Sequence, residues 1–317
     1  MKLEKSNVID DYRRWRKSYL RDLKYKEISK NTSILYNRIL NLFEDFITNQ
    51  DEVAKLTQID REFFLDFIEN IEEKSKNGVF SKKTKRLYLS ILKSFFVYIS
   101  DNNDEFYTFE NEFKIQIKGV SKPKKVKYLS DIEVAKILNY INQRVDNYGL
   151  YYDYIYSFGI KLMLFGGLRI SEVLQLRLEN ITISQLEDKN GIKDMYEIEL
   201  NETKSREEQI ALIKIVDIEK EIIYFSEIRD RDEYIFQSSK NSNIINRSNY
   251  YIGVNNIMRK AGVDKKGLHI YRHTCAMQLY RKSKDILVTK EKLRHSDIKT
   301  TMIYAKAEKS DIANAMR

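Results

Sequence analysis

The chain of 317 residues has one cysteine, one proline and three histidines, and no apolar run approaches the roughly 20 residues that span a bilayer. Because Cys275 is alone, an intramolecular disulfide and a zinc site built from cysteines are both excluded. A lone cysteine also fits a reducing compartment. The first residues, Met1 to Asp11, contain no apolar core of a signal peptide. These absences predict a cytoplasmic protein with no membrane partner.

Charged residues, by contrast, are abundant. They make up 32% of the chain, and the formal net charge is +9, with 56 Lys and Arg against 47 Asp and Glu. This excess favours a polyanionic partner, and nucleic acid is the first candidate. A protein that is merely soluble and basic would show the same balance. The length favours two domains, because single cores rarely grow beyond about 250–300 residues.

The first third of the chain repeats apolar residues at helical spacing. Four amphipathic helices with short polar connections would make a small helical domain, which we expect to span residues 1–115. The predicted helices are Asp11–Lys24, Asn31–Ile47, Asp60–Ile71 and Ser81–Ile99.

Four basic residues lie in the first turns of the last of these helices, where cations oppose the helix dipole. They are Lys82, Lys83, Lys85 and Arg86. Contact with phosphate would offset the cost, so these residues are candidates for DNA binding. The alternative is a solvated basic face.

Residues 116–127 hold the only proline and five lysines, a composition typical of an extended basic linker between domains. This linker is either solvated or lies along a phosphate backbone. In the second case Lys122, Lys124 and Lys125 would contact DNA.

The second domain is expected to span residues 128–317. A capping-box pattern at Ser130 opens a helix. A long helical stretch follows, breaks at Gly166-Gly167 and restarts at Arg169. Period-2 alternation and an Asn-Gly turn predict a small antiparallel sheet, and helices then resume to the end. The predicted strands are Ile181–Ser184, Met195–Leu200 and Gln209–Ile215. The fold class is therefore mainly α with a small antiparallel β-sheet.

Arg169 lies at a helix start directly after a glycine break. A cation there is favourable if it faces an anion that the backbone N–H groups also bind. A surface arginine is the plainer alternative. Glu172, three residues later, either pairs with an arginine or caps its own helix.

Lys204 lies between two predicted strands, in Thr203-Lys204-Ser205. At the tip of a hairpin it could enter a groove, where its ammonium group could protonate a leaving oxygen. Otherwise it is one more surface lysine among many.

All three histidines fall in the last 49 residues of the chain. His269 and Arg272 are three residues apart and share one helical face, whereas His273 is expected to point elsewhere and to be structural. Histidine moves protons near neutral pH, and arginine clamps phosphate. No HExxH or carboxylate-rich pattern accompanies the histidines, so we expect neither a metal nor another cofactor.

Tyr304 follows His295 by nine residues, and a tyrosine hydroxyl can act as a nucleophile. A basic protein that gathers histidine, arginine and tyrosine near one end indicates chemistry on a phosphodiester.

The ordered motifs G-G-L-R-I-S-E, T-K-S-R, H-I-Y-R-H, L-R-H-S-D and I-Y resemble those of the tyrosine recombinases, or phage integrase family. The chain is most similar to the compact Xer-type members, which have a helical core-binding domain before the catalytic domain. The resemblance covers essentially the whole chain. It implies double-stranded DNA as partner and a tetramer on paired DNA sites.

The resemblance also implies a role for each matching residue. The two arginines would hold the scissile phosphate, the lysine would protonate the 5′ oxygen, the histidines would assist proton transfer and hydrogen bonding, and the tyrosine would form a 3′-phosphotyrosyl bond. Religation would then need neither ATP nor metal. The matching residues are Arg169, Arg272, Lys204, His269, His295 and Tyr304.

One departure from the family pattern is Arg294, which stands where the family usually has glycine. We expect an exposed cation beside the site that contacts DNA or alters the local backbone. A type IB topoisomerase-like enzyme, a telomere-resolving enzyme and a non-catalytic DNA-binding relative remain alternatives. The motifs leave integration, excision, transposition and dimer resolution equally open.

Overall fold

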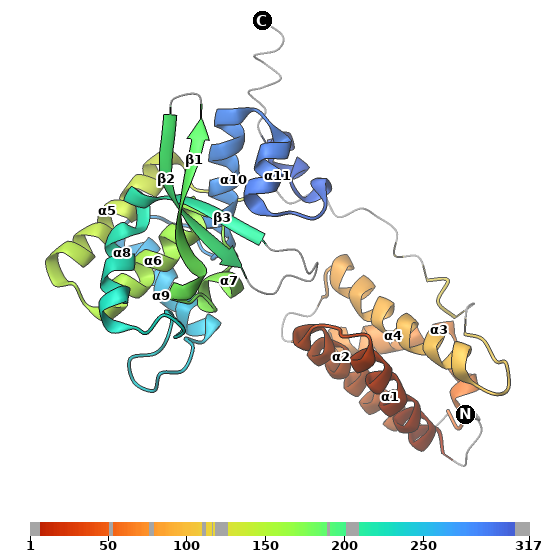
Figure 1. Cartoon of the computed structure of the whole chain (residues 1–317). Coiled ribbons are helices and arrows are strands. Elements are labelled where there is room, and N and C mark those ends of the chain that lie inside the picture. The colour runs from red at the N-terminus through yellow and green to blue at the C-terminus, as the bar shows by residue number, and fades with distance from the viewer. Residues whose placement is uncertain are drawn as a thin grey trace, which may run out of the picture. The chain divides into compact units, whose positions relative to one another are not determined.

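The computed structural model divides into two compact units, Met1–Lys124 and Lys125–Arg317. It describes residues 7–50, 53–75, 79–109, 112–115, 117, 126–188, 191–200 and 209–307. Both units are mainly helical, and one three-stranded antiparallel sheet lies in the second (Figure 1). The predicted fold class is confirmed. The predicted linker falls almost entirely outside the described residues.

The N-terminal unit contains the four predicted helices. Their bounds are α1 (Val8–Tyr25), α2 (Lys30–Thr48), α3 (Arg61–Glu73) and α4 (Lys82–Asn102), with the short 3-10 helix η1 (Leu56–Gln58) before α3. Each α-helix begins after a polar side chain that accepts a backbone N–H bond, which satisfies one of the unpaired donors at a helix start. These caps are Asn7, Ser29, Asp60 and Ser81.

Aromatic side chains form the core of the N-terminal unit. Phe43 of α2 packs against Phe64, Phe67 and Phe96, with ring centroids 4.9–5.8 Å apart. Trp15 of α1 is fully buried. Buried rings of this size supply much of the apolar area that holds a small helical unit together.

The C-terminal unit surrounds one nearly apolar helix, α6 (Tyr151–Phe165), which contacts the short helix that follows it and four longer helices. These longer helices are α5 (Asp131–Tyr148), α8 (Ile215–Ile228), α9 (Arg247–Lys260) and α10 (His269–Ser283). Because α6 is buried on most sides, its C-terminal end brings Gly166 into the interior of the unit, and the partly exposed Arg169 follows three residues later. The remaining elements are α7 (Ile170–Leu174), η2 (Leu178–Asn180), α11 (Ile286–Leu293), η3 (Ile298–Thr300) and α12 (Met302–Ala307).

The sheet has the order β1-β2-β3, and both pairs are antiparallel. Its strands are β1 (Ile181–Asp188), β2 (Gly191–Leu200) and β3 (Gln209–Lys214). The first two are longer than predicted, because their pairing continues up to Asp188 opposite Gly191. The inner face of the sheet buries Tyr196, Ile198 and Ile213 in the core of the unit.

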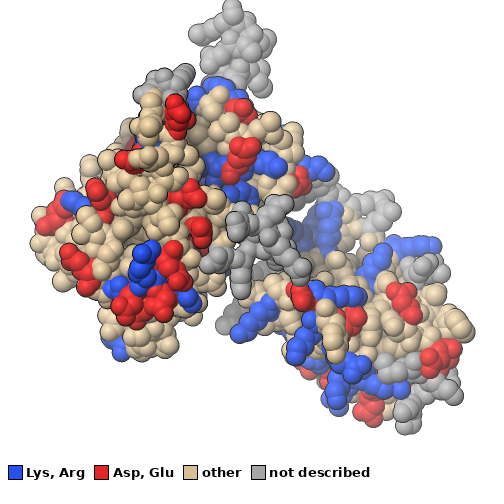
Figure 2. Space-filling view, in the orientation of Figure 1, with Lys and Arg blue, Asp and Glu red and all other residues tan. Residues whose placement is uncertain are grey.

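No helix in the described part of the chain is long and apolar enough to cross a membrane. Basic and acidic side chains are interspersed over both units in Figure 2, with basic groups over the region of α10 and α11.

Candidate active site

The site begins at the turn that ends α6. The backbone N–H groups of Gly166 and Leu168 both donate to Leu162 O. Gly167 has φ +64°, a conformation that glycine adopts without the strain that a Cβ would bring. A Cβ at Gly167 would also lie 3.1 Å from Leu293 Cδ2. Gly167 therefore lets Cys275 of α10 and Leu293 of α11 approach this turn closely.

Arg169 is the N-cap residue of α7, and Glu172 binds it twice. Glu172 Oε2 accepts from the Arg169 backbone N at 2.7 Å, and Oε1 accepts from Arg169 Nη1 at 2.6 Å. Both roles considered for Glu172, helix capping and arginine pairing, occur together. The Arg169 side chain stays 36% exposed, so it can still reach an anion from solvent.

Arg272 lies on α10 and is buried, with 4% of the residue exposed. Its guanidinium donates to Gly167 O and, at 2.5 Å, to Leu293 O. Burial and the neighbouring charges of Arg169 and Arg294 lower its pKa to about 10. The guanidinium of Arg272 thus joins the end of α11 to the turn at Gly166 and Gly167, here called the glycine turn.

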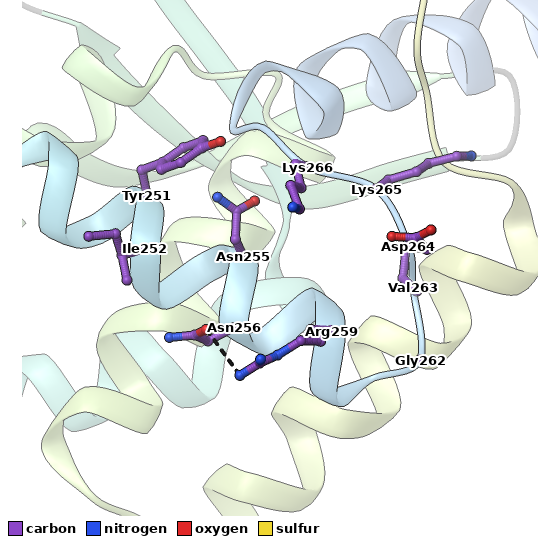
Figure 3. Close-up of a pocket in the computed structure, with 10 residues that line it drawn as sticks. All are labelled: Tyr251, Ile252, Asn255, Asn256, Arg259, Gly262, Val263, Asp264, Lys265 and Lys266. Carbon is purple, nitrogen blue, oxygen red and sulfur yellow. Dashed lines mark hydrogen bonds between the residues drawn. The ribbon is translucent and has the colours of Figure 1, made fainter.

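His269 is the first residue of α10, and α9 fixes the backbone that leads to it. Asn255 Oδ1 accepts from the Gly267 backbone N at 3.1 Å. Asn255 also lines a cavity between α9 and the loop at residues 262–266, where Lys265 and Lys266 lie (Figure 3). The pKa of His269 is lowered by burial and by the charge of Arg247, followed by those of Arg272 and Arg169.

The expectation that Arg294 is an exposed cation is wrong. Its side chain is only 5% exposed, and Nη2 lies 3.3 Å from Glu172 Oε2. Arg294 ends α11 in the left-handed conformation, with φ 54° and ψ 47°, which explains why glycine suits this position. An L-residue pays about 1 kcal/mol for this conformation. Hydrogen bonds to the carbonyls of Gly166, Gly167 and Lys292 offset that cost.

His295 and Tyr304 lie on either side of η3. His295 Nδ1 is 2.9 Å from Thr301 Oγ1, and the Tyr304 backbone N donates to Thr301 O. Burial and the charges of Arg272, Arg169 and Arg294 lower the pKa of His295 to about 4. This imidazole is therefore neutral at pH 7 and can accept or donate one hydrogen bond at each ring nitrogen.

Tyr304 is 1% exposed and packs against Met277 and Leu293. Its hydroxyl lies 2.8 Å from His273 Nδ1. Burial raises the pKa of Tyr304 to about 12, and burial with the charges of His269 and Arg272 lowers the pKa of His273 to about 4. In this arrangement the phenol is protonated and the imidazole is neutral.

The expectation that His273 points away from the site is therefore wrong. His269 and His273 are four residues apart, which also places two side chains on one helical face. Their ring centroids lie 6.4 Å apart. The four-residue spacing in the sequence was therefore enough to place His273 on the same face as His269. Its contact with Tyr304 follows only from the packing of α12 on α10, which the sequence does not reveal.

The other candidates are more dispersed. Lys204, Lys122, Lys124 and Lys125 lie outside the described residues. On α4, Lys82 and Lys83 are exposed. Lys85 donates to Glu72 at 2.7 Å, and Arg86 donates to Ile117 O at 2.7 Å.

In the described ranges, no three His, Cys, Asp or Glu residues cluster in a way that could hold a metal ion. What the site does bring together is an arginine pair, three imidazoles and a tyrosine hydroxyl. Such a set suits transfer of a phosphoryl group from a phosphodiester to the hydroxyl, with the arginines stabilising the additional charge.

Comparison with known proteins agrees with this class of chemistry. Residues 127–311 match the phage integrase family, and residues 17–103 match the phage integrase N-terminal SAM-like domain. The chain belongs to the phage integrase family. It is a tyrosine recombinase, an enzyme that breaks and rejoins DNA strands.

Similar proteins include the tyrosine recombinase XerH of Campylobacter jejuni, 28% identical over 285 residues that cover 85% of this chain and 73% of the relative. The tyrosine recombinase XerD of Rickettsia bellii is 25% identical over 308 residues, covering 92% and 93%. Among solved structures, XerH bound to a palindromic difH substrate after cleavage has a TM-score of 0.76 at 22% identity, covering 99% and 98%. The Tn1549 transposon integrase on circular-intermediate DNA has a TM-score of 0.66 at 16% identity, covering 94% and 95%.

Proposed function

We propose that this chain is a site-specific recombinase that cleaves double-stranded DNA with Tyr304 as nucleophile. The observation that carries the assignment is Arg272, whose guanidinium bonds both Gly167 O and Leu293 O. These bonds draw the Arg169 turn, α10 and the end of α11 together. Tyr304, through His273, attaches to the same helix α10. Four segments that are far apart in the chain thereby form one site.

The chemistry follows from the charges. Tyr304 Oη gives up its proton, for which the neutral imidazole of His269 is the proposed acceptor, and attacks phosphorus. A P–O bond to tyrosine forms and the P–O bond to the 5′ oxygen breaks. Arg169 and Arg272 stabilise the extra negative charge of the transition state. Lys204 is the proposed donor of the proton that the 5′ oxygen takes up. One P–O bond replaces another, so the free 5′ hydroxyl can reverse the step without an external energy source.

The proposed nucleophile is buried in this structure, because only 1% of Tyr304 is exposed. A phosphodiester cannot reach its hydroxyl while α12 lies in this position. Attack therefore requires α12 to shift and the hydrogen bond to His273 to break. Cleavage is in this way coupled to the position of a short helix.

The nucleophile assignment is tested with a nicked suicide substrate that traps the covalent complex. The wild-type chain should form a protein–DNA adduct, and Tyr304→Phe should form none while its DNA affinity stays within about twofold, because only a hydroxyl is lost. Tyr280→Phe, at a half-buried position near the C-terminal end of α10, is the matched control and should form the adduct normally. An adduct with Tyr304→Phe would disprove the assignment.

Four protomers on two paired DNA sites are the proposed working assembly. This proposal rests on the similarity to DNA-bound recombinases. A type IB topoisomerase-like enzyme would relax supercoils on one DNA without pairing two sites. Two differently labelled DNA sites should therefore yield strands that carry both labels, and relaxation without such products would favour the alternative.

A further inference from the structure

Arg294 connects the supports of two other arginines. Its Nη2 donates to Glu172 Oε2 at 3.3 Å and to Gly167 O at 3.2 Å. Glu172 is the carboxylate that holds Arg169, and Gly167 O is an acceptor for Arg272. One nitrogen of Arg294 therefore bonds both the carboxylate that holds Arg169 and a carbonyl that holds Arg272.

The other terminal nitrogen, Nη1, fixes the backbone around the same two anchors. Nη1 of Arg294 donates to Lys292 O at 3.0 Å and to Gly166 O at 3.3 Å. The C-terminal end of α11 and the glycine turn are thereby joined by a group that is 5% exposed. A buried group with this many bonds has little freedom to move, and neither have its acceptors.

The charges of the cluster point the same way. Three guanidinium groups, of Arg169, Arg272 and Arg294, surround the one carboxylate of Glu172. Two of them bind this carboxylate directly, so Glu172 neutralises Arg169 only in part. Without Arg294, Glu172 would pair with Arg169 alone and would hold it more tightly away from an incoming phosphate.

We propose that Arg294 is a positioning residue for the phosphate-binding pair Arg169 and Arg272, and that it acts through Glu172 and Gly167 without touching DNA. This inference rests on the proposed function. It requires arginine at this position, because a planar guanidinium can serve four acceptors, whereas the ammonium group of lysine has three donors and no fixed plane.

The test replaces Arg294 with glycine, which adopts the left-handed backbone without strain. The adduct should form about 100-fold more slowly at saturating DNA, as expected when reacting groups are displaced by about an ångström. DNA affinity should change less than threefold, because Arg294 contacts no phosphate. Guanidinium ions added to the buffer should restore part of the rate, and Arg294→Lys should not.

Lys284→Gly is the matched control. Lys284 is also basic and also ends a helix in the left-handed conformation, with φ 54°, but it is exposed at the C-terminal end of α10. Its replacement should leave the rate of adduct formation at the wild-type value. If Arg294→Gly is unfolded at the assay temperature, Arg294→Asn serves instead, because asparagine tolerates the same backbone conformation.

A double-mutant cycle separates positioning from general stabilisation. If Arg294 acts through Glu172, the combined Arg294→Gly and Glu172→Gln variant should lose no more rate than the worse single variant. The proposal is overturned if the losses of rate in the two single variants add in the double variant. It is also overturned if Arg294→Gly forms the adduct at the wild-type rate, or if this variant loses DNA affinity and keeps its rate. The wild-type adduct is measured first: its absence would instead refute Tyr304 cleavage, and the role of Arg294 with it.

Discussion

Burial sets the chemistry of single residues in this site. The pKa values of Tyr304 and His273, about 12 and about 4, lie about 8 units apart (12 − 4). Transfer of the phenolic proton to His273 is therefore strongly uphill in this arrangement. Yet the two groups are 2.8 Å apart. His273 accordingly holds the hydroxyl in place, and deprotonation of Tyr304 belongs to a state in which α12 has moved.

The lowered pKa of His273 makes a prediction about stability. Its ordinary pKa of 6.5 applies to the unfolded chain, and the folded value is about 4. Between these values the unfolded chain binds more protons, so stability is lost as the pH falls from about 6.5 to about 4. His273→Phe keeps a ring but cannot titrate, and its free energy of unfolding should fall less steeply over this window.

Urea unfolding followed by circular dichroism at several pH values measures both slopes. The carboxylates are common to the two chains, so their titration cancels in the comparison. Parallel slopes for wild type and His273→Phe would contradict the lowered pKa.

At the scale of elements, the turn between α6 and α7 matters more than either helix by itself. It is short, yet its two glycine carbonyls accept hydrogen bonds from Arg272 and Arg294. The largely buried α6 fixes the start of this turn, and the capping of α7 by Glu172 fixes its end. The helices thus deliver backbone acceptors as well as side chains to the site.

Gly167→Ala should destabilise the protein by about 1–2 kcal/mol, because alanine is strained at φ +64° and its Cβ would crowd Leu293 Cδ2 at 3.1 Å. Gly262→Ala is the matched control. Gly262 has φ +71°, but a Cβ there would meet nothing within 4 Å. Thermal unfolding of both variants separates backbone strain from crowding, and equal losses would show that crowding at Leu293 contributes nothing.

At the scale of the whole molecule, two separate hydrophobic cores match the two units. One core is built from α1 to α4, with Phe109 and Phe113. The other surrounds α6, and a small cluster around Tyr304 adjoins α10 and α11. Each unit therefore has its own source of stability.

DNA binding by such a chain should weaken steeply with salt, because each neutralised phosphate releases condensed counterions. A plot of log affinity against log salt concentration should be linear, with a slope of about −0.9 for each phosphate contact. Lys83→Ala on the exposed start of α4 should remove about one phosphate contact and so make this slope shallower by about 0.9. A flat salt response of the wild type would argue against phosphate contact.

Much of the molecule was predictable from the sequence because the causes are local. Helical periodicity, polar caps such as Ser81 and Ser130, and the strand alternation act over a few neighbouring residues, and the helices and strands occur where these patterns place them. The extension of β1 and β2 was not predicted, because the paired residues near Gly191 lack clear alternation.

The sequence by itself determined the family, the fold class and the residues available for chemistry, since short motifs and their order suffice for these. Only the tertiary structure decided what two residues do. Arg294 is buried against the glycine turn, where it bonds the carbonyl of Gly167, a residue 127 positions earlier in the chain. His273 contacts the hydroxyl of Tyr304, 31 positions later. Such contacts depend on how helices pack around a core, and no pattern confined to neighbouring residues specifies that packing.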